Sequence, residues 1–156
     1  MELAVGGSVG VEAQLVEASG ILVDAVQRGF QVAAFIYGTA AGGLGELPDR
    51  VTVSVVTIGE LQLGVLSAVD AASRARRGDT LALAKTVEPV PISESIMGAW
   101  ARLVVDCRTA GIQRTVKLMD ALIAATAIDL GLPVVTQDDD YDQMVTAHRA
   151  LHVLKV

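Results

Sequence analysis

From Arg50 onward, the chain alternates between short β-branched segments and longer segments whose apolar residues have helical spacing. The stretch Val51-Thr-Val-Ser-Val-Val56, for example, directly follows Pro48 and Asp49 and has the composition of a buried strand. Strands that alternate with helices favour a mostly parallel sheet covered by helices on both faces. The sequence therefore predicts an α/β fold, in which ligands bind where the strands end.

The expected elements follow one another closely after Pro48. Strands are predicted over residues 51–56, 88–92, 133–136 and 152–156, and helices after Thr57, over 71–86, from Ser93 to Gly111 and over 116–130. Thr57 is the expected N-cap of the first helix, with Glu60 as its capping-box partner. Pro89 and Pro91 confine the 88–92 strand to a sheet edge.

The size and composition of the chain predict one domain over residues 1–156, because 52% of its residues are hydrophobic. A net charge of −6 argues against a protein that binds nucleic-acid phosphates mainly through Lys and Arg. It leaves open an enzyme that binds phosphate through a metal ion. The single cysteine, Cys107, excludes an intramolecular disulfide and is expected to be a buried hydrophobe. We expect neither a secretory leader in residues 1–20 nor a membrane span in 29–45, and therefore a cytoplasmic location.

Acidic residues recur where the expected strands end. Glu60 lies in the helix after the first strand, and Asp120 lies one turn inside an otherwise apolar helix. Asp138 and Asp140 follow the strand that ends at Thr136. Because the ends of parallel strands meet at one sheet edge, we expect these carboxylates to converge. Few Lys or Arg residues lie near them in sequence, and like charges repel unless a cation is held among them.

Each of these acids also has a purely structural explanation. Asp120 interacts favourably with the helix dipole, Glu60 completes a capping box, and Asp138 is an ordinary N-cap. Burial weakens this explanation for Asp120, because an ionised carboxylate beside Leu118 and Leu122 is costly unless something pairs with it. Asp120 therefore implies a metal or a basic partner.

Ligands that are all oxygen atoms favour a hard cation, Mg²⁺ or Mn²⁺, over zinc. His148 and His152 lie outside the expected cluster and are poorly spaced for a shared zinc ion. A metal held by carboxylates activates water for attack on a phosphodiester. A glycine-rich nucleotide loop is the alternative, but Gly42-Gly43-Leu44-Gly45 lacks a convincing preceding strand and the wider G-x-G-x-x-G spacing.

Three segments of the chain together resemble a known family. They are Val53-Ser-Val-Val-Thr-Ile-Gly-Glu60, Met119-Asp120-Ala-Leu-Ile-Ala-Ala-Thr-Ala127 and Leu132-Pro-Val-Val-Thr136-Gln-Asp138-Asp-Asp140-Tyr141. In this order they look like the signatures of the VapC-type toxins of the PIN-domain ribonuclease family. The resemblance implies a PIN-like three-layer sandwich with a mostly parallel central sheet flanked by helices.

The resemblance also implies a function. It is that of the toxin component of a type II toxin-antitoxin system, an endoribonuclease that depends on Mg²⁺, with Mn²⁺ as the alternative ion. Such a toxin cleaves structured RNA, such as transfer or ribosomal RNA, is bound by a VapB-type antitoxin, and forms a homodimer. By motif match, Glu60, Asp120 and Asp138 correspond to the family's catalytic and metal-binding acids, with Asp140 as an accessory carboxylate and Thr136 as a site-shaping hydroxyl.

The beginning of the chain departs from the family pattern. The family's first-strand aspartate corresponds best to Asp24, a further expected catalytic acid and metal ligand, but Ala25 and Val26 replace the usual hydroxyl pair. Residues 1–20 form an extra segment, and 25–43 are atypical. A frame-shifted or mis-started coding region would explain this boundary, and so would a diverged site. The second explanation leaves an alternative function, a catalytically impaired module that binds a VapB-type antitoxin without cleaving RNA.

Overall fold

The computed structural model describes residues 34–37 and 50–155, with side chains from Thr52 onward. In chain order its elements are β1 (Ala34–Tyr37), β2 (Arg50–Val53), α2 (Val55–Leu66), α3 (Ala71–Ala84), α4 (Glu94–Thr109), α5 (Leu118–Leu130), β3 (Val134–Thr136), α6 (Asp140–Ala147) and β4 (Val153–Lys155). The expected site residue Asp24 and the extra segment 1–20 lie outside the described residues. None of the described helices is long and apolar enough to cross a membrane.

The four described strands form one sheet in the order β2-β1-β3-β4. β3 and β4 pair in parallel, whereas β1 pairs antiparallel with both β2 and β3. β2, β3 and β4 therefore run in one direction and β1 runs against them. The predicted α/β class is confirmed. β1 was not predicted, because its sequence Ala-Phe-Ile-Tyr lies in a stretch rich in Gly and Ala with weak periodicity.

The strand predicted over residues 88–92 is reduced to a single parallel bridge between Ser54 and Val90. The Val90 amide donates to the carbonyl of Val53 (2.8 Å), and the Val90 carbonyl accepts from the amide of Val55 (2.9 Å). Pro89 and Pro91 flank Val90 and have no N–H to donate, so pairing cannot extend in either direction. The prediction of a full strand here was wrong.

The first described helix, α2, starts earlier than the sequence pattern suggested. Ser54 is its N-cap, and the Ser54 hydroxyl accepts from the Val56 amide at 3.1 Å. Thr57 is buried inside the helix rather than capping it, so the predicted capping box of Thr57 and Glu60 is wrong. The strand predicted to reach residue 56 ends at Val53 because the Ser54 hydroxyl offers the turning backbone an acceptor.

The other helix boundaries follow local signals in the sequence. Asp70 caps α3 by accepting from the Ser73 amide at 2.7 Å, and Ser93 caps α4 by accepting from the Ile96 amide at 3.2 Å. α5 ends at Gly131, whose φ of 65° is a left-handed conformation that glycine adopts without a Cβ clash. These ends agree with the predicted helices to within a few residues.

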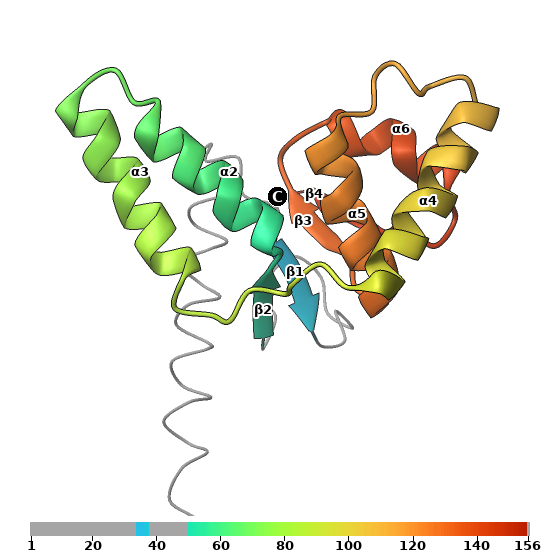
Figure 1. Cartoon of the computed structure of the whole chain (residues 1–156), viewed down its shortest axis with the longest axis horizontal. Coiled ribbons are helices and arrows are strands. Elements are labelled where there is room, and N and C mark those ends of the chain that lie inside the picture. Colours follow the sequence, from blue (N-terminus) through green and yellow to red (C-terminus); the bar gives the residue numbers. More distant parts are fainter. Residues whose placement is uncertain (1–33, 38–49, 156) are drawn as a thin grey trace, which may run out of the picture.

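Two groups of helices flank the sheet. Figure 1 shows α2 and α3 side by side as a hairpin on one side, and α4, α5 and α6 grouped on the other, with the strands between them. α5 packs mainly against α4 and also contacts α2, β3 and α6. This central position brings the first turn of α5 near the ends of the sheet strands.

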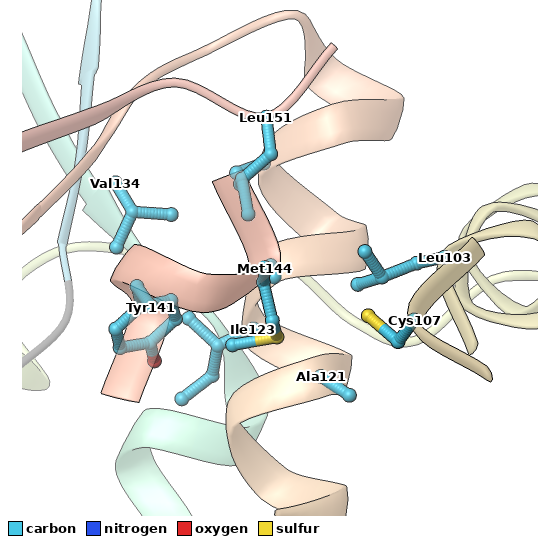
Figure 2. Close-up of a cluster of buried hydrophobic side chains, with 10 residues drawn as sticks. Leu103, Cys107, Ala121, Ile123, Val134, Tyr141, Met144 and Leu151 are labelled. Atoms are coloured by element: carbon cyan, nitrogen blue, oxygen red, sulfur yellow. The ribbon is translucent and has the colours of Figure 1, made fainter. Parts of the chain in front are cut away.

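The main hydrophobic core lies among α4, α5, β3 and α6. Figure 2 shows its larger members, including Tyr141, Met144 and Leu151. Cys107 is also part of this core and is only 1% exposed, which confirms its predicted burial. Trp100 is half-buried and packs against both this core and a smaller cluster of Ile96, Ala99 and Ala125.

Candidate active site

Three elements bring the predicted acids together. Glu60 comes from the middle of α2, Asp120 from the first turn of α5, and Asp138 and Asp140 from the end of β3 and the start of α6. The charges of Asp120 and Asp138 both act on Glu60, and those of Asp138 and Asp140 act on Asp120. The structure thus places the four acids in one electrostatic neighbourhood, although they are far apart in sequence.

Asp120 is the most constrained of these acids. Its residue is only 8% exposed, and its Oδ2 atom is buried without a hydrogen-bond partner in the described part of the chain. Burial raises the pKa of Asp120, and the carboxylates of Asp140 and Asp138 raise it further, against an opposing effect of Lys117. Asp120 does lie in the first turn of α5, where the helix dipole favours an anion. Because its pKa is nevertheless raised, the dipole does not fully stabilise its charge.

Glu60 is half-buried, and its surroundings also disfavour its charged form. Burial is the main cause that raises the pKa of Glu60, followed by the charges of Asp120 and Asp138, while Lys117 acts to lower it. The capping role considered for Glu60 is excluded, because the N-cap of α2 is Ser54. Glu60 lies in the middle of the helix, where it cannot cap the helix end, and the charges of two other carboxylates act on it.

Hydrogen bonds shape the loop that carries the remaining acids. Thr136 is buried, and its hydroxyl accepts from the Asp138 amide at 3.0 Å. The Asp138 carboxylate in turn accepts from the Asp140 amide, also at 3.0 Å. Asp139, not Asp138, is the N-cap position of α6, and it makes no side-chain capping bond. The expectation that Thr136 shapes this loop therefore has a geometric basis.

Lys117 is a site residue that the sequence reasoning missed. Its ammonium group donates to the Asp140 carboxylate, and its charge lowers the pKa of both Glu60 and Asp120. The statement that few basic residues lie near the acids was therefore wrong. The available signal was the spacing of three residues between Lys117 and Asp120, which places both at the start of one helix. Lys155, which pairs with Asp139 and Asp142 from the far end of the chain, gave no such signal.

The sequence matches the PIN domain family over residues 27–146, which is most of the chain. The chain belongs to the PIN-domain family, and its relatives are of the VapC type. It is 60% identical over 93 residues to Ribonuclease VapC8 of Mycobacterium tuberculosis, covering 60% of this chain and 83% of that protein. It is 46% identical over 102 residues to Ribonuclease VapC4 of the same species, covering 62% of this chain and 77% of the relative.

Solved structures of related proteins agree with the fold of this PIN domain. The structure of VapBC-5 from Mycobacterium tuberculosis, a member of the VapBC family of toxin-antitoxin systems, aligns with a TM-score of 0.66 and 36% identity. That alignment covers 76% of this chain and 91% of the other. VapBC2 from Rickettsia felis, bound to a DNA fragment from its promoter, aligns with a TM-score of 0.55 over 67% of this chain and 73% of that one. At 19% identity, this second likeness concerns the fold alone.

The donor chemistry of this PIN-domain site fits a hard divalent cation. The described side chains that would hold it are Glu60, Asp120 and Asp138, all oxygen donors, and the buried Oδ2 of Asp120 lacks a partner among the described residues. Within those residues, however, no three carboxylate, imidazole or thiol groups are close enough together to bind one ion. A complete site would need these acids to move closer or a further ligand to join them. Asp24, the additional ligand expected from the sequence, lies outside the described residues.

Proposed function

We propose that this chain is a metal-dependent endoribonuclease and the toxin of a toxin-antitoxin pair. The observation that carries the proposal is the buried Asp120 carboxylate, which is coupled to acids from two other elements and has an oxygen without a partner in the described structure. Such an arrangement is costly for folding, because burial and like charges both oppose ionisation. Burial and neighbouring carboxylates raise the pKa of Asp120 and Glu60, and acids with raised pKa values near the ends of sheet strands favour a catalytic role over a structural one.

The relatives support the chemical class of the reaction. Two of them, with 60% and 46% identity, are named ribonucleases. A bound Mg²⁺ or Mn²⁺ ion would lower the pKa of a water molecule and stabilise negative charge on the phosphate. We propose structured RNA, such as transfer or ribosomal RNA, as the substrate. Hydrolysis would form a bond from the water oxygen to phosphorus and break one phosphodiester P–O bond.

Different residues of the site would have different roles in this reaction. Glu60, Asp120 and Asp138 would supply the negative charge that holds the cation, and Thr136 would fix the backbone that carries Asp138. Lys117 already balances part of this negative charge through Asp140. Tyr141 lies buried beside the acids, and burial raises the pKa of its phenol above the ordinary value, so it stays neutral and adds no further negative charge.

A VapB-type antitoxin is the proposed protein partner, because the VapBC-5 structure is described as a toxin-antitoxin system and aligns over most of both chains. A second function follows if the metal site is incomplete. The chain would then bind the antitoxin without cleaving RNA. The lack of three converging metal ligands within the described residues favours this second candidate.

Cleavage of RNA by matched variants tests the proposal. Purified full-length protein is incubated with transfer and ribosomal RNA in Mg²⁺ or Mn²⁺ and, as a control, in excess chelator. Asp120→Asn should reduce the cleavage rate on the order of 100-fold or more, because an acid that holds the catalytic ion is lost. Asp129→Asn is the matched control, since Asp129 lies on the same helix but is exposed, and its carboxylate accepts a hydrogen bond from the Ser95 hydroxyl at 3.0 Å.

Cleavage that is lost in chelator and in Asp120→Asn, but kept in Asp129→Asn, would support the nuclease. An Asp120→Asn variant that still cuts at the parent rate would contradict it. If the parent protein cleaves no RNA in any metal but binds the antitoxin, the second candidate is the better account.

A further inference from the structure

A pocket of about 590 Å³ lies between α4 and the beginning of α5. Its volume is within the range of small-molecule sites, which is roughly 300–1,000 Å³. Trp100 and Arg108 line it from α4, and Gln113, Lys117 and Leu118 line it from the connecting loop and the start of α5. The pocket therefore combines an aromatic ring, two cations, an amide and an apolar wall.

Lys117 joins this pocket to the candidate active site. Its side chain lines the pocket while its ammonium group pairs with Asp140. Leu118 and Ala121, which also line the pocket, lie on either side of Asp120 in the sequence of α5. A molecule in the pocket would thus lie against the same helical turn that carries Asp120.

The two cations of the pocket are notable in a chain with a net charge of −6. Arg108 is exposed and makes no ion pair with the described residues, so its planar guanidinium can bind a phosphate through two hydrogen bonds. Gln113 can donate to or accept from a nucleobase edge. These groups fit an anion that carries a planar, hydrogen-bonding ring.

Trp100 supplies the aromatic surface. The residue lines the pocket and also packs against the two apolar clusters. Aromatic side chains of this kind stack with nucleobases. The indole Nε1 of Trp100 is buried and has no acceptor among the described residues. A buried N–H without an acceptor costs about 1–3 kcal/mol, and a small shift of the ring toward a bound acceptor would remove that cost.

We propose that this pocket binds one nucleotide of the RNA strand beside the phosphate that is cleaved, with its base on Trp100 and its phosphate on Arg108 and Lys117. This inference rests on the proposed function and extends it by naming a substrate subsite. In this arrangement Arg108 and Trp100 act on substrate binding and leave the carboxylates undisturbed.

Trp100 is the single tryptophan of the chain, so tryptophan fluorescence reports on the surroundings of this one pocket-lining residue. Uridine and adenosine 5′-monophosphates are titrated into the full-length protein in excess chelator, which prevents binding through a metal ion. A saturable change in Trp100 emission is expected. Inorganic phosphate and the corresponding nucleosides are titrated in parallel, and each should bind at least about tenfold more weakly than the complete nucleotide, because each uses half of the site.

Two arginine variants on α4 distinguish binding in the pocket from a general effect of positive charge on nucleotide affinity. Arg108→Gln should raise the dissociation constant about tenfold, because it removes a charge-assisted hydrogen bond to phosphate. Arg102→Gln removes the same charge from an exposed position of α4 that does not line the pocket, and should change the dissociation constant less than twofold. With an RNA substrate, Arg108→Gln should raise KM while kcat stays unchanged.

Three results would overturn the inference. They are no saturable signal up to about 10 mM nucleotide, equal losses in the two arginine variants, and phosphate that binds as tightly as the nucleotide. Failure of the proposed function is separable from these results. Nucleotide binding in a protein that cleaves no RNA would contradict the nuclease alone, and cleavage without nucleotide binding would contradict the pocket alone.

Discussion

Two regions of this protein differ in how they are held together. The helical body, residues 94–155, contains all ten buried residues of the main hydrophobic core. The hairpin, residues 55–84, leaves Leu63 and Leu66 largely exposed, and Val69 just beyond its first helix is 98% exposed. A hydrogen bond joins its two helices, from the Arg77 guanidinium to the Gly64 carbonyl at 2.6 Å.

The difference matters because the candidate site spans both regions. Asp120, Asp138 and Asp140 stand on the body, where buried neighbours fix the backbone, whereas Glu60 stands on the hairpin. Local stability follows the density of buried apolar contacts. Among the described residues, the hairpin has fewer buried apolar side chains than the body, and the position of Glu60 relative to the other acids depends on it. We therefore expect a change in the hairpin to alter the site without disturbing the main hydrophobic core.

The largest expected effect comes from truncating one leucine in each region. Leu103→Ala should lower the free energy of unfolding by about 2–5 kcal/mol, because Leu103 is fully buried and the truncation leaves a cavity in the body. Leu66→Ala should lower it by less than about 0.5 kcal/mol, because Leu66 is 72% exposed on the hairpin. Urea denaturation measures both. Similar losses in the two variants would break the comparison.

Amide hydrogen exchange measures how readily each of the two regions opens locally. Amides in the middle of α5 should exchange through global unfolding, because seven of the thirteen residues of this helix are buried. Amides in the middle of α2, which has one buried residue, should exchange on the order of 100-fold faster. Equal protection in the two helices would mean that the hairpin is as stable as the body.

The smallest effect concerns the charge of Asp120. Its pKa is raised above the ordinary value of 3.8 by burial, so the folded state binds a proton more readily than the unfolded state. Stability is then lost as pH rises from this ordinary value through the raised pKa, and the loss is complete at higher pH. Asp120→Asn removes this cost and should raise the free energy of unfolding at neutral pH by about 1 kcal/mol.

Thermal or urea unfolding at pH 7 and near pH 4 measures this effect. The gain in Asp120→Asn should be smaller near pH 4 and should approach zero below about pH 3, where the parent residue is protonated in both the folded and the unfolded state. Asp129→Asn is the control at an exposed position of α5 and should change the free energy of unfolding by less than about 0.5 kcal/mol. A variant that is less stable than the parent at pH 7 would indicate that Asp120 has a structural role.

The sequence predicted the body better than the rest of the described fold. Helices with a regular apolar stripe and a clear stop, such as α4 with its Ser93 cap and α5 with Gly131, were found near their expected ends. β1 was missed because four apolar residues in a glycine-rich stretch have no periodicity that distinguishes them. The start of α2 was misplaced because Ser54 and Thr57 are both good N-caps, and tertiary pairing at Val90 selects between them.

The acids of the candidate site could be predicted from the sequence, but the basic residue that pairs with them could not. Asp120 was detectable because an acid in an apolar helix is unusual, and the end of β3 pointed to Asp138. The ion pair of Lys117 with Asp140 joins residues 23 positions apart, and no local pattern specifies such a contact. Its detection required the path of the chain between α5 and α6.

The central claim is that acids from both regions share one divalent cation, and calorimetric titration with Mn²⁺ or Mg²⁺ tests it most directly. The account predicts saturable binding to the parent protein, no binding to Asp120→Asn, weaker binding to Glu60→Gln and unchanged binding to Asp129→Asn. Loss in the first two variants would establish that the hairpin and the body contribute to one site. Absence of binding in the parent, or equal binding in Asp120→Asn, would contradict the claim.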